Sequence, residues 1–441
     1  MKQTFSASLL ESIYTKLENP HSLFRIPQSR QPVHVVYGGA HLFKSDTPQK
    51  LGNLALKSLE TYAPNTEEFA NVFGLKNEIS QIIYKRVKAK LQKEAVEDFR
   101  IDFEDGYGFR AWEEEDSHAI SASDALARSF REKTITPFCG FRIKSFAPET
   151  FKRSTRTLDL FLTNLIEKTA GELPENFVVT LPKITRAEEV EVLTELLEEF
   201  ETQNNLPTDS IKIEIMIETP EAILNQKGEI ILRKLVEAAC GRCKSAHFGA
   251  FDYTSAFGIV AEHQHLQHEA CNFARQMMQI ALSPLGIRLS DSVTTEMPVP
   301  IYKGENLSGK QTAENRKAIH KAWRAHFDNI THSLINGFYQ SWDLHPAQFV
   351  ARYAAIYAFF FESKDSSAKR LEGFIEKAAQ ANLTGNQFDD AASAQGLLNF
   401  FIRAQSCGAL DETEILEATN LSSEELRANS FAKILADRDN I

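Results

Sequence analysis

Eight short apolar or β-branched runs recur between residues 33 and 344, and helix-forming sequence follows nearly every one of them. This alternation predicts strands joined by helical crossovers, which makes the strands parallel. Eight such units predict a closed (β/α)8 TIM barrel, a fold that takes about 250 residues or more. The expected strands are 33–36, 99–103, 138–143, 177–181, 211–217, 246–250, 287–289 and 341–344.

An open, doubly wound sheet is the alternative fold. It predicts a glycine-rich phosphate loop after the first strand. The sequence there is Tyr37-Gly38-Gly39, and neither G-x-G-x-x-G nor a Walker A motif occurs in the chain. We therefore expect an α/β barrel at 33–363, an N-terminal helical lead-in at 1–32 and a helical C-terminal extension at 364–441.

Composition narrows the class of protein. The chain has 441 residues, 43% of them hydrophobic and 25% charged, which is typical of a soluble globular protein. The net charge of −11 and the absence of a basic stripe argue against a nucleic-acid partner. We find no signal-peptide core and no membrane-length apolar run, so we expect a cytoplasmic protein without a membrane partner. Five scattered cysteines indicate reduced thiols, and the single Cys240–Cys243 pair is weak evidence for a zinc site.

The fifth expected strand ends on a carboxylate. Isoleucines alternate from Ile211 to Ile217, Glu218 follows, and Thr219-Pro220 then matches an N-cap and a first helical position. Glu218 should therefore lie at the carboxyl end of a buried strand, where α/β barrels bind their ligands. The alternative is that Glu218 only supports the following helix N-terminus.

Other strand ends carry charges too, and in a parallel barrel they would converge on one face. They are Glu104 and Asp105 after the second strand, Arg142 on the third, Lys183 after the fourth, Asp252 after the sixth, Asp291 after the seventh and Asp343 after the eighth. Buried carboxylates must be neutralised. An arginine plus a divalent metal does this, and an all-oxygen ligand set favours Mg²⁺ or Mn²⁺ over Zn²⁺. Such a metal would stabilise an enolate, with Arg142 pairing with a substrate carboxylate or an oxyanion.

Each of these residues also has a structural alternative. Asp105 could belong to a turn, Arg142 to a barrel salt bridge and Lys183 to the surface. Asp291 and Asp343 could serve nearby helices. Histidines His268 and His345 are further candidates for proton transfer near neutral pH.

Six ordered motifs give the chain a resemblance to a known family, the HpcH/HpaI aldolase and citrate lyase β-subunit family. They are Asp102-Phe103-Glu104-Asp105, Phe141-Arg142-Ile143-Lys144, Leu181-Pro182-Lys183, Glu218-Thr219-Pro220, Gly249-Ala250-Phe251-Asp252 and His345-Pro346-Ala347-Gln348. The resemblance spans about residues 33–362. One departure is the turn Gly39-Ala40-His41-Leu42, where the family often has glycine and arginine.

The resemblance implies a metal-dependent barrel that makes or breaks C–C bonds next to a carbonyl. By matching position, Glu218 and Asp252 would be the Mg²⁺ ligands and Arg142 would bind substrate. Glu104 and Asp105 would lie near the substrate or a metal-bound water. Because relatives assemble, we also expect a homo-oligomer.

We therefore predict a lyase or aldolase acting on a small 2-oxo or hydroxy acid. Its catalytic residues would be Arg142, Glu104 and Asp105, and Lys183, Asp291 and Asp343 would help to bind the substrate. One alternative is an acyl-CoA lyase or condensing enzyme of the malyl-CoA lyase or malate synthase type. Another, from a different class, is a non-catalytic metabolite-binding protein.

Overall fold

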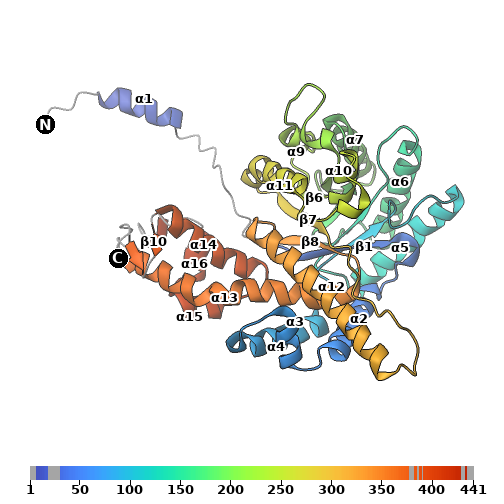
Figure 1. The fold of residues 1–441 in the computed structure, drawn as a ribbon. Helices are drawn as coiled ribbons and strands as arrows, with labels where there is room; N and C mark the ends of the chain where they lie inside the picture. The colour runs from blue at the N-terminus through green and yellow to red at the C-terminus, as the bar shows by residue number, and fades with distance from the viewer. Residues whose placement is uncertain are drawn as a thin grey trace.

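The computed structural model describes residues 6–17, 30–376, 382–384, 387–389, 391–428 and 433–434. Eight parallel strands close into a barrel in sequence order, so β8 pairs with β1. The strands are β1 (His34–Gly39), β2 (Asp98–Asp102), β3 (Phe138–Arg142), β4 (Phe177–Leu181), β5 (Lys212–Ile217), β6 (Cys243–Phe248), β7 (Arg288–Val293) and β8 (Gln340–Asp343). The predicted (β/α)8 barrel is confirmed, and Figure 1 shows it ringed by helices.

The helices surround the barrel and extend beyond it. The larger ones up to β8 are α2 (Thr47–Tyr62), α3 (Thr66–Phe73), α4 (Asn77–Lys93), α5 (Trp112–Arg131), α6 (Phe151–Lys168), α7 (Ala187–Gln203), α11 (Glu269–Leu282) and α12 (Gly309–Ile335). The shorter ones are α8 (Pro220–Ile223), α9 (Leu232–Ala238) and α10 (Ala250–Ala256). None of the helices within the described ranges has the length and apolar character needed to cross a bilayer.

One predicted helix is wrong. The helix-forming sequence at 223–239 indicates a single helix after the fifth strand. In the structure, α8 ends at Ile223 and α9 begins at Leu232. Between them, the Asn225 side chain accepts hydrogen bonds from the Lys227 and Glu229 amides, and Gly228 adopts the left-handed conformation. This turn satisfies the backbone locally and so competes successfully with the helix.

The barrel interior is polar, because every second residue of a strand points inward. Glu214 on β5 accepts from Arg100 Nη2 at 2.8 Å and lies 2.8 Å from His247 Nε2. It also accepts from the Tyr37 hydroxyl at 3.3 Å. Arg100 pairs with Asp98 as well. These residues come from four different strands, so the network fills the centre of the barrel.

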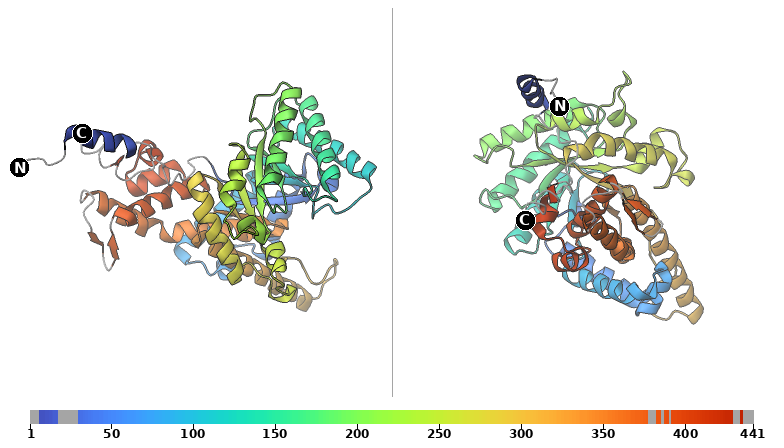
Figure 2. Two further views of the ribbon diagram at one scale, coloured as in Figure 1. Left: turned by 90° about the horizontal axis from the view of Figure 1, so that it is seen from above. Right: turned by 90° about the vertical axis from the view of Figure 1, so that its left-hand side faces the viewer.

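The C-terminal extension packs at the N-terminal end of the barrel. Helix α13 (Phe349–Glu376) runs without a break past residue 363, where we predicted a domain boundary, and that division stays a prediction. Helices α14 (Ala391–Ser406), α15 (Glu412–Thr419) and α16 (Ser423–Ala428) follow it. Arg403 of α14 donates to Gln31, just before β1, at 2.7 Å. Figures 1 and 2 show these helices projecting to one side of the barrel.

The N-terminal helix and the C-terminal extension each differ from the barrel in structure. Helix α1 (Ala7–Leu17) stands apart from the barrel in Figure 1. The predicted helical extension also contains one antiparallel pair of short strands, β9 (Asn382–Thr384) and β10 (Gln387–Asp389).

Candidate active site

An arginine from β3 lies in the barrel mouth, held by an aspartate from β2. The Arg142 guanidinium donates to both carboxylate oxygens of Asp102, at 2.7 and 2.6 Å. The two residues are neighbours across paired strands and both are buried. The Arg142 guanidinium also lies over the Tyr37 ring, at 4.8 Å from its centroid. This bidentate pair fixes the plane and position of the guanidinium.

A lysine from the end of β4 ties the β2 loop to the same mouth. Lys183 Nζ donates to Glu104 at 2.5 Å and to Asp105 at 3.0 Å. Arg142 Nη1 lies 3.2 Å from the other Glu104 oxygen. Burial raises the pKa of Glu104, Arg142 opposes the shift, and Asp105 adds to it. Glu104 is therefore a carboxyl that can hold a proton more readily than usual.

Glu218 lies at the end of β5 and is 2% exposed. One carboxylate oxygen accepts the Lys183 backbone N–H at 2.7 Å, and Lys183 adopts a left-handed φ of 52° there. A Cβ on Gly249 would lie 2.5 Å from Glu218, so only glycine lets the chain after β6 approach so closely. Burial raises the pKa of Glu218 to about 8; the charge of Arg142 opposes this shift, and the charge of Asp252 adds to it.

The second predicted metal ligand, Asp252, lies in the first turn of α10. Its side chain is open to solvent on one side, yet the surrounding protein removes enough water to raise its pKa, against the opposing charge of Lys183. Within the described part of the chain it forms no ion pair. The structure thus brings Glu218, Asp252 and Arg142 to one end of the barrel, as the sequence indicated.

These residues fit a Mg²⁺ ion in charge and chemistry. At the mouth, the two cations Arg142 and Lys183 face five carboxylates, which are Asp102, Glu104, Asp105, Glu218 and Asp252. Among the residues that the structure describes, no group of three or more His, Cys, Asp or Glu side chains is arranged around one metal position. Two carboxylates nevertheless suffice for Mg²⁺, which keeps several waters and takes further ligands from its substrate.

Two predicted substrate-binding residues point away from the mouth, into the helix layer. The Asp343 carboxylate is fully buried among His34, His326 at 2.7 Å and Arg352 at 2.8 Å. Asp291 is not at a strand end as predicted, since β7 continues to Val293. Its carboxylate accepts from Arg275 of α11 at 2.8 Å and from Ser333 of α12 at 2.5 Å. Both carboxylates thus anchor helices to the barrel in this structure, and their substrate-binding role stays a prediction without geometric support.

The two candidate histidines form helix caps. His268 Nδ1 accepts the Ala270 amide at the start of α11, and His345 Nδ1 accepts the Ala347 amide. In the His345-Pro346-Ala347-Gln348 motif, the Gln348 side chain accepts the His345 amide and donates to the Thr294 carbonyl. This motif therefore closes the chain after β8 by local hydrogen bonds.

Sequence reasoning missed the aromatic floor of the mouth. Tyr37 and Trp342 stack with ring centroids 4.3 Å apart, and Tyr37 also hydrogen-bonds His247 at 3.0 Å. Arg142 lies above both rings. A signal was present: Tyr37, Trp342 and His247 occupy the inward positions of their strands, which period two would have identified.

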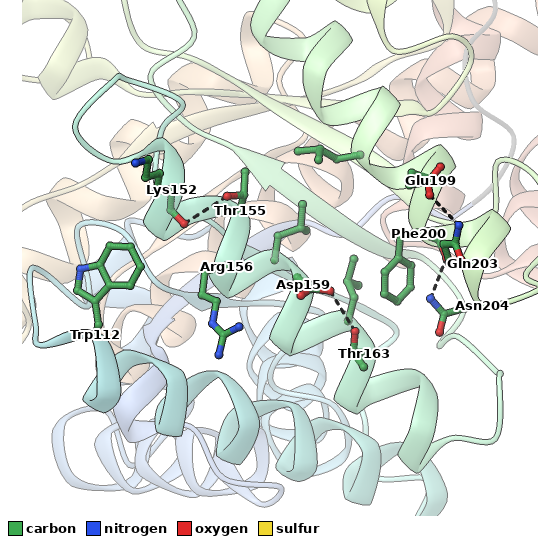
Figure 3. A pocket seen from close by; sticks show the side chains of 13 residues that line it. Trp112, Lys152, Thr155, Arg156, Asp159, Thr163, Glu199, Phe200, Gln203 and Asn204 are labelled. Carbon is green, nitrogen blue, oxygen red and sulfur yellow. Dashed lines mark hydrogen bonds between the residues drawn. The ribbon is translucent and has the colours of Figure 1, made fainter.

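Two cavities are relevant to ligand binding, and only one of them adjoins the mouth. One of about 750 Å³ adjoins the mouth and is lined by Lys183, Arg186 and Lys234, among others. The other, of about 620 Å³, lies outside the barrel between α6 and α7, with Leu162 and Phe200 in its wall (Figure 3). The first is of a size that small-molecule sites use.

Fold and site together define a parallel (β/α)8 barrel with an acidic, arginine-containing mouth. The chain belongs to the family described as "Domain of unknown function (DUF6986)", which matches residues 26–434. No curated protein matches it.

Comparison with solved structures finds similar chains at low sequence identity. A citrate lyase from Burkholderia xenovorans LB400 is 18% identical, with a TM-score of 0.57 over 90% of this chain and 99% of that one. A Haloferax volcanii malate synthase, in a magnesium and glyoxylate complex, is 14% identical with a TM-score of 0.48, over 92% and 99%. The predicted resemblance is thereby confirmed as a citrate lyase-like fold, and membership of the HpcH/HpaI aldolase family stays a prediction.

We expect Asp343→Asn to destabilise the protein and to leave ligand binding unchanged. The substitution leaves Arg352 buried beside a neutral amide, and breaking a buried ion pair costs about 3–5 kcal/mol. Urea unfolding followed by circular dichroism measures this, with Asp328→Asn, which removes an exposed pair with Arg324, as the control. Weaker binding of a 2-oxo acid at unchanged stability would instead support the substrate-binding prediction.

We expect Glu218→Gln to stabilise the metal-free protein at pH 8. The pKa of Glu218 is about 8 in the folded state, against an ordinary value of 4.5. Between these values the folded state binds a proton that the unfolded state lacks, so stability falls as pH rises. Melting temperatures in EDTA from pH 5 to 8 should converge for the two proteins at pH 5 and favour the variant at pH 8. Parallel curves would contradict the prediction.

Proposed function

We propose that the protein is a Mg²⁺-dependent carbon–carbon lyase or aldolase that acts on a 2-oxo or hydroxy acid through an enolate. The observation that carries this proposal is the buried Glu218 carboxylate. Among the residues that the structure describes, no cationic side chain is bonded to it, although Arg142 lies nearby. A buried carboxylate is expensive to keep charged without a partner, and a metal ion would supply one.

Glu218 and Asp252 would hold the metal. When bound, Mg²⁺ would act as a Lewis acid that favours the enolate form of the substrate. Both side chains reach the mouth from the ends of neighbouring strands, where barrel enzymes place catalytic groups.

Arg142 would bind the substrate carboxylate. Asp102 occupies Nε and Nη2, so Nη1 remains for the substrate once Glu104 moves aside. Tyr37 supports the guanidinium from below and keeps water off that face. A pre-positioned arginine stabilises developing negative charge without reorganising during the reaction.

Glu104 and Asp105 would move the proton next to the carbonyl. Glu104 has a raised pKa and Asp105 a lowered one, so the two neighbours favour different protonation states. Groups whose pKa values are pushed apart suit acid and base roles. Lys183, which contacts both, would hold them in place.

The same assays distinguish the two alternative functions from the proposed one. An acyl-CoA lyase or condensing enzyme would use acyl-CoA in place of the free acid. A metabolite-binding protein would bind a 2-oxo acid tightly without turning it over.

The decisive experiment is a calorimetric titration of MgCl₂ into the wild type, Glu218→Gln and Asp252→Asn. We expect each variant to weaken Mg²⁺ binding by at least about 10- to 100-fold, the loss seen even for residues one shell further from a metal. Glu221→Gln, an exposed carboxylate on α8, is the matched control and should bind Mg²⁺ like the wild type. Unchanged affinity in both ligand variants would overturn the proposal.

Arg142→Lys tests the substrate role separately. A lysine cannot keep the bidentate contact with Asp102 and still reach the substrate. We expect kcat/KM for C–C cleavage of oxaloacetate or a related acid to fall by about 100-fold or more, while Mg²⁺ affinity stays within twofold. An equal loss of Mg²⁺ affinity would show that the substitution damaged the whole mouth.

A further inference from the structure

Helix α1 presents an apolar face that is open to solvent. Every residue over 6–15 is exposed, and the large apolar side chains among them are Leu9, Leu10, Ile13 and Tyr14. Because residues three and four apart are neighbours on a helix surface, these side chains gather on one side of α1. Figures 1 and 2 show α1 beyond the C-terminal helices, on the side of the molecule away from α6.

A helix as short as α1 needs a surface to pack on. It has 11 residues, and isolated helices shorter than about 12–15 residues are marginal in water. Most helical stability in proteins comes from the packing of an apolar face. We therefore expect the apolar face of α1 to be covered in the assembled protein, by a surface that is itself apolar and wide enough for a helix.

The cavity of about 620 Å³ between α6 and α7, here called the α6–α7 groove, has these properties. Its apolar lining consists of Leu158 and Leu162 from α6, Leu196 and Phe200 from α7, and Trp112 from the start of α5. Leu158 and Leu162 are buried, and Trp112 is 52% exposed at one edge of the groove (Figure 3). An amphipathic helix that lays its apolar face into an apolar groove is a recurring mode of recognition.

The charges beside the groove complement those of α1. Lys152, exposed near the start of α6, lines the groove and forms no ion pair within the described ranges. Arg156, one turn further along α6, is already paired with Asp116 at 3.1 Å. On α1, the exposed Glu11 lies one turn from Tyr14 at the edge of the apolar face, and it has no ion-pair partner among the described residues. A helix lying in the groove would therefore bring Glu11 to a lysine that is available.

We propose that the α6–α7 groove binds α1 of a second copy of this chain, and that two copies exchange their α1 helices. A chain of the length of residues 18–29, which join α1 to the barrel, can reach about 40 Å, enough to cross to a neighbouring copy. One docked helix of this length is a small interface. Reciprocal exchange doubles it and closes the assembly as a twofold dimer.

Sedimentation equilibrium of the full-length chain tests this interface. We expect the wild type to dimerise and Ile13→Asp to weaken dimerisation about 10-fold or more, because the substitution would bury a charge in an apolar groove. Ser8→Asp adds the same charge on the opposite side of α1 and should dimerise like the wild type. A monomeric wild type, or equal dimerisation by Ile13→Asp, would overturn the proposal.

Disulfide trapping distinguishes helix exchange from the docking of α1 in its own groove. One preparation carries Ile13→Cys and the other carries Thr163→Cys, an exposed position in the groove, and both carry Cys240→Ser to remove the exposed native thiol. We expect a disulfide-linked dimer when the two are mixed and oxidised, and none when Ser8→Cys replaces Ile13→Cys. An unlinked mixture sinks the proposal, and so does a single chain with both Ile13→Cys and Thr163→Cys that links only within itself.

Charge reversal tests the pairing of Glu11 with Lys152. Glu11→Lys and Lys152→Glu should each weaken dimerisation about 2- to 5-fold, the range for an exposed ion pair. The double variant should recover the affinity of the wild type, since it restores opposite charges. Losses that simply add in the double variant would show that α1 does not lie beside Lys152 and would overturn the assignment of the groove.

Failure of the dimer and failure of the proposed function give different results, because the groove lies outside the barrel. Mg²⁺ affinity should be the same in Ile13→Asp as in the wild type. A wild type without Mg²⁺ binding would remove the proposed function, while sedimentation and disulfide trapping would still decide whether the groove binds α1.

Discussion

A carboxylate buried in a protein must be paired with a cation or give up its charge, and this constraint organises the whole barrel. Four strand carboxylates each pair with an arginine, in the pairs Asp102–Arg142, Glu214–Arg100, Asp291–Arg275 and Asp343–Arg352. The first two pairs lie inside the barrel and the last two fasten helices to its outside. No arginine in the described part of the chain is bonded to Glu218, and that difference separates a candidate ligand from a structural residue.

Hydrophobic periodicity was enough to predict the barrel. The alternating isoleucines of β5 identify a buried strand, and Thr219 caps the next helix as expected, accepting the Ala222 amide at 3.1 Å. Local turns were harder to predict from the sequence. The side-chain hydrogen bonds of Asn225 form a turn that divides a segment whose composition indicates a single helix. Strand ends were also uncertain, so Asp291 was placed after a strand that in fact contains it.

The candidate site was predictable only where strand position and side-chain direction were both considered. Glu218 shares the inward direction of Glu214, and Asp343 shares the outward direction of Ser341, so counting by two separates them. The partners could not be predicted in this way. Arg275 reaches Asp291 from a helix 16 residues earlier, and His34 reaches Asp343 across 309 residues, and no local pattern encodes such contacts.

The placement of the C-terminal helices adds a last step to this reasoning. Because α14 packs beside Gln31, before β1, the extension stabilises the end of the barrel opposite the mouth. At the mouth, the β2–α5 loop contributes both Glu104 and Asp105. In barrels of this kind, the residues at the N-terminal face stabilise the fold. The loops at the C-terminal face carry the catalytic residues. A single loop that carries both candidate proton-transfer carboxylates would fix their spacing through one residue of backbone, while Lys183 holds both side chains.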